Sequence, residues 1–144
     1  MWIRRIVVGV DGSRNSDRAA SVAGDLAQLT GAEIIAVHSV GLLEGRPASG
    51  EDRVDHRNAL RQALETTWTE TARRTGTRVR CELHDGDAIS TLLRAAADAG
   101  ADLIVVGRHG HRQFPEQVLG STSAAVAATA HCPVLVIPDD PVAD

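Results

Sequence analysis

The chain has 144 residues, 43% of them hydrophobic, which suits one domain with a single core rather than two domains. Its formal net charge is −4, and acidic residues and arginines are scattered along it, so the sequence argues against a nucleic-acid partner. All fifteen basic residues are arginines, and the absence of lysine excludes both a P-loop ATPase and Schiff-base chemistry on a lysine side chain.

Five short apolar runs alternate along the chain with segments of helical periodicity. The predicted strands are residues 3–10, 33–40, 78–83, 102–106 and 133–137. Apolar residues at helical spacing predict helices around residues 19–27, 60–68 and 89–97, and a last helix over residues 121–130. Several strands are continuously apolar, which is typical of parallel strands covered on both faces. The alternation predicts an α/β doubly wound domain.

Three glycines and one long loop separate these predicted elements. Gly31, Gly76 and Gly100 each follow a predicted helix, where a left-handed C-cap favours glycine. Residues 41–52 form the one long predicted loop, which is interpreted either as a lid or as a simple surface insertion.

The ends of the chain and its cysteines set further expectations. We expect one domain over residues 1–138 and a polar, proline-rich tail over residues 139–144 that frays. Cys81 and Cys132 lie in or beside strand-like runs, so we expect buried free thiols and a reducing, cytoplasmic compartment. No stretch approaches the ~20 apolar residues that span a membrane, so no membrane partner is expected.

The segment GRHGHRQFPEQVLGSTS, residues 107–123, follows the fourth predicted strand directly. Gly107 and Gly110 lack a Cβ that would keep backbone amides away from an anion. A helix then starts at Gly120, Ser121, Thr122 and Ser123, and the free N–H groups of a helix start attract negative charge. Cationic side chains in the same segment are Arg108, His111 and Arg112. Each glycine alone could be a turn or a cap, but the combined spacing favours a phosphate site.

Two strand ends carry unusual residues. The first strand ends in VVGVDGS, which contains Asp11, and the fourth ends in the glycine-containing segment. Ligands of open parallel sheets bind beyond the carboxyl ends of neighbouring strands whose connections leave in opposite directions. We therefore infer that the first and fourth strands are neighbours and that a binding crevice lies at their C-terminal ends.

The spacing Gly107-x-x-Gly110, nine residues, then Gly120-Ser121 resembles the nucleotide-binding signature of the universal stress protein family. Further resemblance to the strands and turns of that family lies in RRIVVGVDGS, IIAVHSV, LHDGDA, ADLIVVGRHG and HCPVLVIP. Together these segments span about residues 2–138. The resemblance implies a flavodoxin-like α/β sandwich with five parallel strands, usually a homodimer, in the subclass that binds ATP.

The resemblance also implies which residues would hold the nucleotide. The nucleoside would lie beside Gly9, Asp11 and Ser39. Ribose and phosphates would be held by Gly107, Arg108, His109, Gly110, His111, Arg112 and Gln113, and by Gly120, Ser121 and Thr122. The expected ligand is ATP with Mg²⁺, for which Asp11 is a candidate metal ligand, and AMP or cyclic AMP is the alternative. A purely structural role for Asp11, bonding to amides near the first helix, is equally open.

Hydrolysis of a bound nucleotide would need metal-supporting carboxylates and a positioned base. His109 and His111 are candidate bases, but no second carboxylate lies at a predictable spacing from Asp11. We therefore expect slow or no turnover, at most a weak ATPase. His38 is expected to bond to a neighbouring carbonyl at the end of its strand.

The last strand, Val134–Ile137, is predicted to lie at an edge of the sheet. A bare apolar edge invites pairing, so we expect a homodimer through antiparallel pairing of this strand, with a tail folded over the edge as the alternative. These features together predict a cytoplasmic, homodimeric, ATP-binding sensor or regulator of a stress response. A nucleotide-independent dimeric interaction module and a cyclic-AMP-binding protein are the alternative functions.

Overall fold

The computed structural model describes residues 2–41, 50–109 and 120–139. The elements in chain order are β1 (Arg5–Gly9), α1 (Arg14–Thr30), β2 (Glu33–Val40), α2 (Gly50–Glu65), the short 3₁₀ helix η1 (Thr67–Thr69), α3 (Glu70–Arg73), β3 (Val79–Asp85), α4 (Ala88–Ala99), β4 (Leu103–Gly107), α5 (Ser121–Thr129) and β5 (Val134–Ile137). The chain thus alternates strands and helices as the periodicity predicts.

The strands form one parallel sheet in the order β3-β2-β1-β4-β5. β1 is central, and its Val7 lies in register with Ile35 of β2 on one side and Ile104 of β4 on the other. The connection that follows β1 leads to β2 and the connection that follows β4 leads to β5, toward opposite edges of the sheet, which confirms the doubly wound, flavodoxin-like prediction. It also confirms that the first and fourth strands are neighbours.

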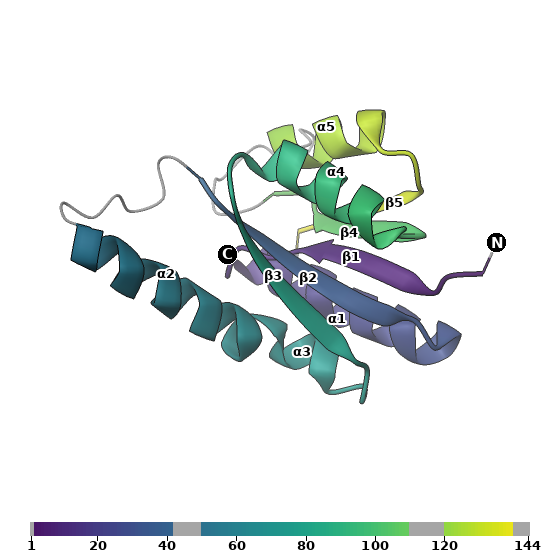
Figure 1. The fold of residues 1–144 in the computed structure, drawn as a ribbon. Coiled ribbons are helices and arrows are strands. Elements are labelled where there is room, and N and C mark those ends of the chain that lie inside the picture. Colours follow the sequence, from purple (N-terminus) through teal and green to yellow (C-terminus); the bar gives the residue numbers. More distant parts are fainter. Residues whose placement is uncertain (1, 42–49, 110–119, 140–144) are drawn as a thin grey trace.

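Helices cover both faces of the sheet (Figure 1). α1, α2 and α3 lie on one face, where Ile6 and Val8 of β1 are buried against α1 residues such as Ala20. α4 and α5 lie on the other face, where Val7 packs with Leu92 and Val126. Successive residues of a strand point to opposite faces, so a central strand covered on both sides has to be continuously apolar.

Local signals set the ends of several helices. Ser13 caps α1 by accepting a hydrogen bond from the Ser16 N–H, and Asp87 caps α4 by accepting from the Ser90 N–H. Gly31 and Gly100 occupy left-handed C-caps with φ of 76° and 63°, as predicted. The Ser90 N–H also lowers the pKa of the Asp87 carboxyl below its usual value.

The segment between β2 and β3 differs from the prediction. α2 begins at Gly50, so residues 50–52 belong to a helix rather than to the long loop; residues 42–49 lie outside the described part of the chain. The predicted helix over residues 60–68 breaks after Glu65 and continues as η1 and α3. Thr69 is fully buried, and its hydroxyl donates to the Leu64 carbonyl at 2.7 Å. Such local side-chain bonds compete with the helical pattern.

Both cysteines are free and half-buried rather than fully buried. The Cys81 thiol donates to the Leu64 carbonyl at 3.5 Å. Burial, and to a lesser degree the Asp102 carboxylate, raise the pKa of the Cys132 thiol. A raised pKa keeps the thiol protonated and unreactive near neutral pH.

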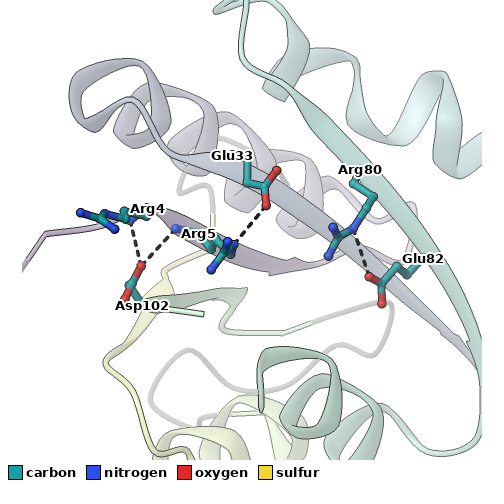
Figure 2. A network of polar contacts seen from close by, with 6 residues as sticks. All are labelled: Arg4, Arg5, Glu33, Arg80, Glu82 and Asp102. Carbon is teal, nitrogen blue, oxygen red and sulfur yellow. Dashed lines mark hydrogen bonds and ion pairs between the residues drawn. The ribbon is translucent and has the colours of Figure 1, made fainter. Parts of the chain in front are cut away.

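Charged residues join the strands at the amino-terminal edge of the sheet (Figure 2). The Asp102 carboxylate, just before β4, accepts the backbone N–H groups of Arg4 at 2.8 Å and Arg5 at 3.2 Å. The Arg5 side chain pairs with Glu33 of β2 at 3.3 Å. Bonding to the Arg4 N–H is the main cause that lowers the pKa of Asp102. These contacts hold the start of β1 between its two neighbours.

Candidate functional site

The carboxyl ends of β1 and β4 lie side by side, with Val8 in register with Val105. Beyond β1 the chain turns through Asp11 and Gly12 into α1, and beyond β4 it continues through Arg108 and His109. The start of α5 returns to the same place, because the Gly120 N–H donates to the Arg108 carbonyl at 3.0 Å. The two segments expected to form the site therefore meet at one edge of the sheet.

The loop after β1 is closed by its own polar side chains. The Asp11 carboxylate accepts the Ser13 N–H at 2.9 Å, and the Asp11 N–H donates to the Ser16 hydroxyl at 3.3 Å. These two hydrogen bonds support a structural role for Asp11, while its role as a metal ligand stays a prediction. Among the described residues no group of three or more His, Cys, Asp or Glu side chains is placed to hold a metal ion.

A contact between the rings of His38 in β2 and Trp68 in η1 lies beside the loop that follows β1. His38 is buried, and its Nδ1 lies 2.7 Å from the Val10 carbonyl, which confirms the expected bond to a strand-end carbonyl. The His38 ring packs edge-on against Trp68 of η1, with ring centroids 5.0 Å apart. A Cβ on Gly12 would lie 2.6 Å from the Trp68 ring, and Gly12 has a φ of +80°. Any larger residue at this position would strain the backbone and displace the Trp68 ring.

The glycines at the strand ends serve helix packing. A Cβ on Gly107 would lie 3.2 Å from the Cβ and carbonyl oxygen of Asn15, in the first turn of α1. A Cβ on Gly9 would lie 3.3 Å from the methyl groups of Leu92 in α4. Both glycines thus let a helix approach the end of a strand. The Arg108 N–H, which a phosphate could otherwise use, donates to the Ile137 carbonyl at 2.8 Å.

The start of α5 is built differently from the starts of α1 and α4. Its N-cap is Gly120, which has no side chain to bond the first-turn N–H groups. The Arg108 carbonyl accepts from both the Gly120 N–H and the Ser123 hydroxyl, the latter at 2.9 Å. Ser121 is exposed and Thr122 half-exposed. First-turn N–H groups without a capping side chain at Gly120, together with the positive end of the helix dipole, therefore lie at the carboxyl edge of β4.

His109 and Asp139 add a contact that sequence reasoning missed. His109 is buried and its Nδ1 lies 2.7 Å from the Asp139 carboxylate, just beyond β5. Asp139, assigned to the fraying tail, is thus tied back to the loop after β4. No local signal in the sequence marks this pair, because the two residues are 30 positions apart. Gly12 and Trp68 were also missed, although the dipeptide Asp11-Gly12 is a turn signal.

Most of the predicted site residues lie together. Those described at the carboxyl edge of the sheet are Gly9, Asp11, Ser39, Gly107, Arg108, His109, Gly120, Ser121 and Thr122. Ser39 lies near the end of β2, in register with His84 of β3. Gly110, His111, Arg112 and Gln113 lie outside the described residues. In the described part of the chain, no helix is both long and apolar enough to span a membrane.

The sequence model of the universal stress protein family matches residues 3–138. The chain belongs to the universal stress protein family. A universal stress protein of Thermus aquaticus is 35% identical over 141 residues, which cover 93% of this chain and 98% of the relative. This assignment confirms the resemblance inferred from the glycine spacing and the strand segments.

Solved universal stress protein structures share the fold. A universal stress protein in complex with cAMP matches with a TM-score of 0.77 and 25% identity, covering 97% of this chain and all of the other. The Archaeoglobus fulgidus universal stress protein in complex with dAMP matches with a TM-score of 0.67 and 26% identity, covering 95% of this chain and 99% of the other. Both of these family members hold an adenine nucleotide.

Proposed function

We propose that this universal stress protein binds an adenine nucleotide at the carboxyl ends of β1 and β4. The observation that carries the proposal is the start of α5, where the N-cap residue, Gly120, provides no side-chain acceptor for the first-turn N–H groups. A phosphate is the natural partner for such a helix start. The cAMP and dAMP complexes of two relatives support the same ligand class.

The proposed ligand is ATP with Mg²⁺, because the spacing of Gly107, Gly110, Gly120 and Ser121 resembles that of the ATP-binding subclass. The nucleoside would lie against Gly9, Asp11 and Ser39. A nucleoside monophosphate or cyclic AMP is the second candidate, and the ligands of the two relatives favour it. The Nδ1 atom of His109, a candidate base, bonds to Asp139 and leaves Nε2 as the nitrogen that could accept a proton. Slow or no hydrolysis is nevertheless part of the proposal, because no second carboxylate lies at a predictable spacing from Asp11 to support a metal ion.

The proposed assembly is a cytoplasmic homodimer that signals stress through nucleotide occupancy. β5 lies at the end of the strand order, and the Pro133 and Ile137 carbonyls accept hydrogen bonds from Ile104 and Arg108 on the β4 side. Alternate residues of a parallel strand point their polar groups to opposite sides, so the N–H groups of Val134 and Val136 face the open edge. That edge supports antiparallel pairing with a second copy.

The ligand proposal is tested by titration calorimetry on nucleotide-free protein with adenosine, AMP, cyclic AMP and Mg-ATP. In Ser121→Glu, a carboxylate at the helix start repels phosphate, while Ser121→Gln is a neutral control of the same size. An acidic residue in the first turn does not destabilise a helix, so both variants should fold. We expect at least about tenfold weaker binding of phosphorylated ligands by Ser121→Glu than by Ser121→Gln. Absence of binding by the wild type would favour the nucleotide-independent interaction module.

The dimer proposal is tested by Val136→Pro, with Val136→Thr as the control. Proline removes one edge-facing N–H and leaves the β4 ladder intact, whereas threonine keeps the N–H and the β-branched shape. Light scattering should report a monomer for Val136→Pro and a dimer for Val136→Thr. An unchanged dimer in the proline variant would exclude pairing through β5.

A further inference from the structure

The residue two positions beyond β5 is bonded to the second residue after β4. The Asp139 Oδ2 atom lies 2.7 Å from His109 Nδ1, and the His109 side chain is only 3% exposed. A carboxylate only accepts hydrogen bonds, so His109 Nδ1 carries the proton and donates it. The other oxygen, Asp139 Oδ1, is buried without a hydrogen-bond partner in the described residues. The Asp139 side chain is 29% exposed, and its bond to His109 offsets part of the desolvation of the carboxylate.

The other side of the His109 ring faces the start of α5. A Cβ placed on Gly120 would lie 3.5 Å from His109 Cδ2, so the ring packs against the N-cap of this helix. The preceding residue, Arg108, links the same elements through its backbone. Its N–H donates to the Ile137 carbonyl of β5 at 2.8 Å, and its carbonyl accepts from the Gly120 N–H at 3.0 Å. Residues 108 and 109 thus connect the end of β5 with the helix start.

We propose that Asp139 is a positioning residue for phosphate binding, acting through His109. By holding the imidazole against Gly120, the carboxylate fixes where the first-turn N–H groups of α5 point. The affinity for the phosphate part of a nucleotide then depends on the chain segment that follows β5. This inference rests on the proposed function, because it assigns a role within the same site.

The effect of Asp139 should depend on the phosphates of the ligand. In Asp139→Ala, the His109 ring loses its 2.7 Å hydrogen bond to the carboxylate beyond β5, and the helix start is held less firmly. We expect binding of AMP and Mg-ATP to weaken about tenfold, and binding of adenosine to change less than about twofold. Asp139→Asn should remain close to wild type, because its amide oxygen still accepts from His109 Nδ1–H.

The experiment is calorimetric titration of the full chain with adenosine, AMP and Mg-ATP. Asp98→Ala, an exposed carboxylate on α4, is the control and should bind like the wild type. The double variant His109→Ala with Asp139→Ala should bind ATP no more weakly than His109→Ala alone, if Asp139 acts through the imidazole. NMR should also show a protected His109 Nδ1–H proton in the ligand-free wild type and its loss in Asp139→Ala.

The outcomes separate this inference from the proposed function. If the wild type binds none of the three ligands, both proposals fail. If the wild type binds nucleotides but Asp139→Ala binds ATP normally, or loses adenosine and ATP equally, only the positioning role is overturned. Absence of the protected Nδ1–H proton in the wild type would also overturn it.

Discussion

Adding one methyl group at Gly120 should disrupt the junction between β4 and α5. The Cβ of Gly120→Ala would lie 2.5 Å from the Arg108 carbonyl oxygen. Ordinary carbon–oxygen contacts begin at roughly 3.3 Å, so helix and strand end must separate by roughly 0.8 Å. The backbone itself poses no obstacle, since the φ of −61° and ψ of 153° at Gly120 suit alanine. The whole effect is therefore steric.

The magnitude follows from what the separation disturbs. Overpacking a tight contact costs about 1–3 kcal/mol. The displaced carbonyl also accepts the Gly120 N–H and the Ser123 hydroxyl, and weakening one such bond costs about 1 kcal/mol. We expect Gly120→Ala to lower the free energy of unfolding by about 2–4 kcal/mol. The free energy of unfolding of a natural domain is about 5–15 kcal/mol, so the variant should still fold.

Urea denaturation followed by circular dichroism, at a fixed protein concentration, measures this loss. Gly41→Ala is the matched control, because no atom of the described residues lies within 4 Å of a Cβ at Gly41. That control should stay within about 0.5 kcal/mol of the wild type. A Gly120→Ala protein as stable as Gly41→Ala would refute the close approach of α5 to the end of β4.

Two further predictions concern opposite edges of the sheet. Bonding to the Arg4 N–H lowers the pKa of Asp102 below its ordinary 3.8, so its stabilising contribution is full above that value and is lost as the pH falls through the lower, folded-state pKa. At pH 7 the wild type should be more stable than Asp102→Asn by less than about 1 kcal/mol. Urea titrations from pH 7 to 2 should show that this difference in stability vanishes in acid. A difference that stays constant with pH would contradict the stabilising role of the Asp102 carboxylate. At the other edge, Gly12→Ala in a Trp2→Phe background should displace Trp68 and shift its fluorescence to longer wavelength. The same change should lower the free energy of unfolding by about 1–3 kcal/mol. Unchanged Trp68 emission would argue against the Gly12–Trp68 contact.

Much of the fold could be predicted because its signals are local. The strands are apolar runs, and the C-caps at Gly31 and Gly100 depend only on the residues beside them. That β1 and β4 are neighbours could be inferred because both of these strands end in unusual residues. The break of the helix at residues 66–69 was not predicted, because the buried Thr69 hydroxyl acts only once η1 is packed.

The sequence by itself determined the order of elements, the family and the segments that meet at the carboxyl edge of the sheet. The reason is that hydrophobic periodicity, helix caps and glycine spacing depend on residues that are close together in the sequence. Only the tertiary structure decided what those glycines do: Gly9 and Gly107 admit helices, and Gly120 admits the Arg108 carbonyl. It also decided the contact of His109 with Asp139. Such contacts join residues far apart in the chain, and no local pattern specifies a distance that depends on how strands and helices pack.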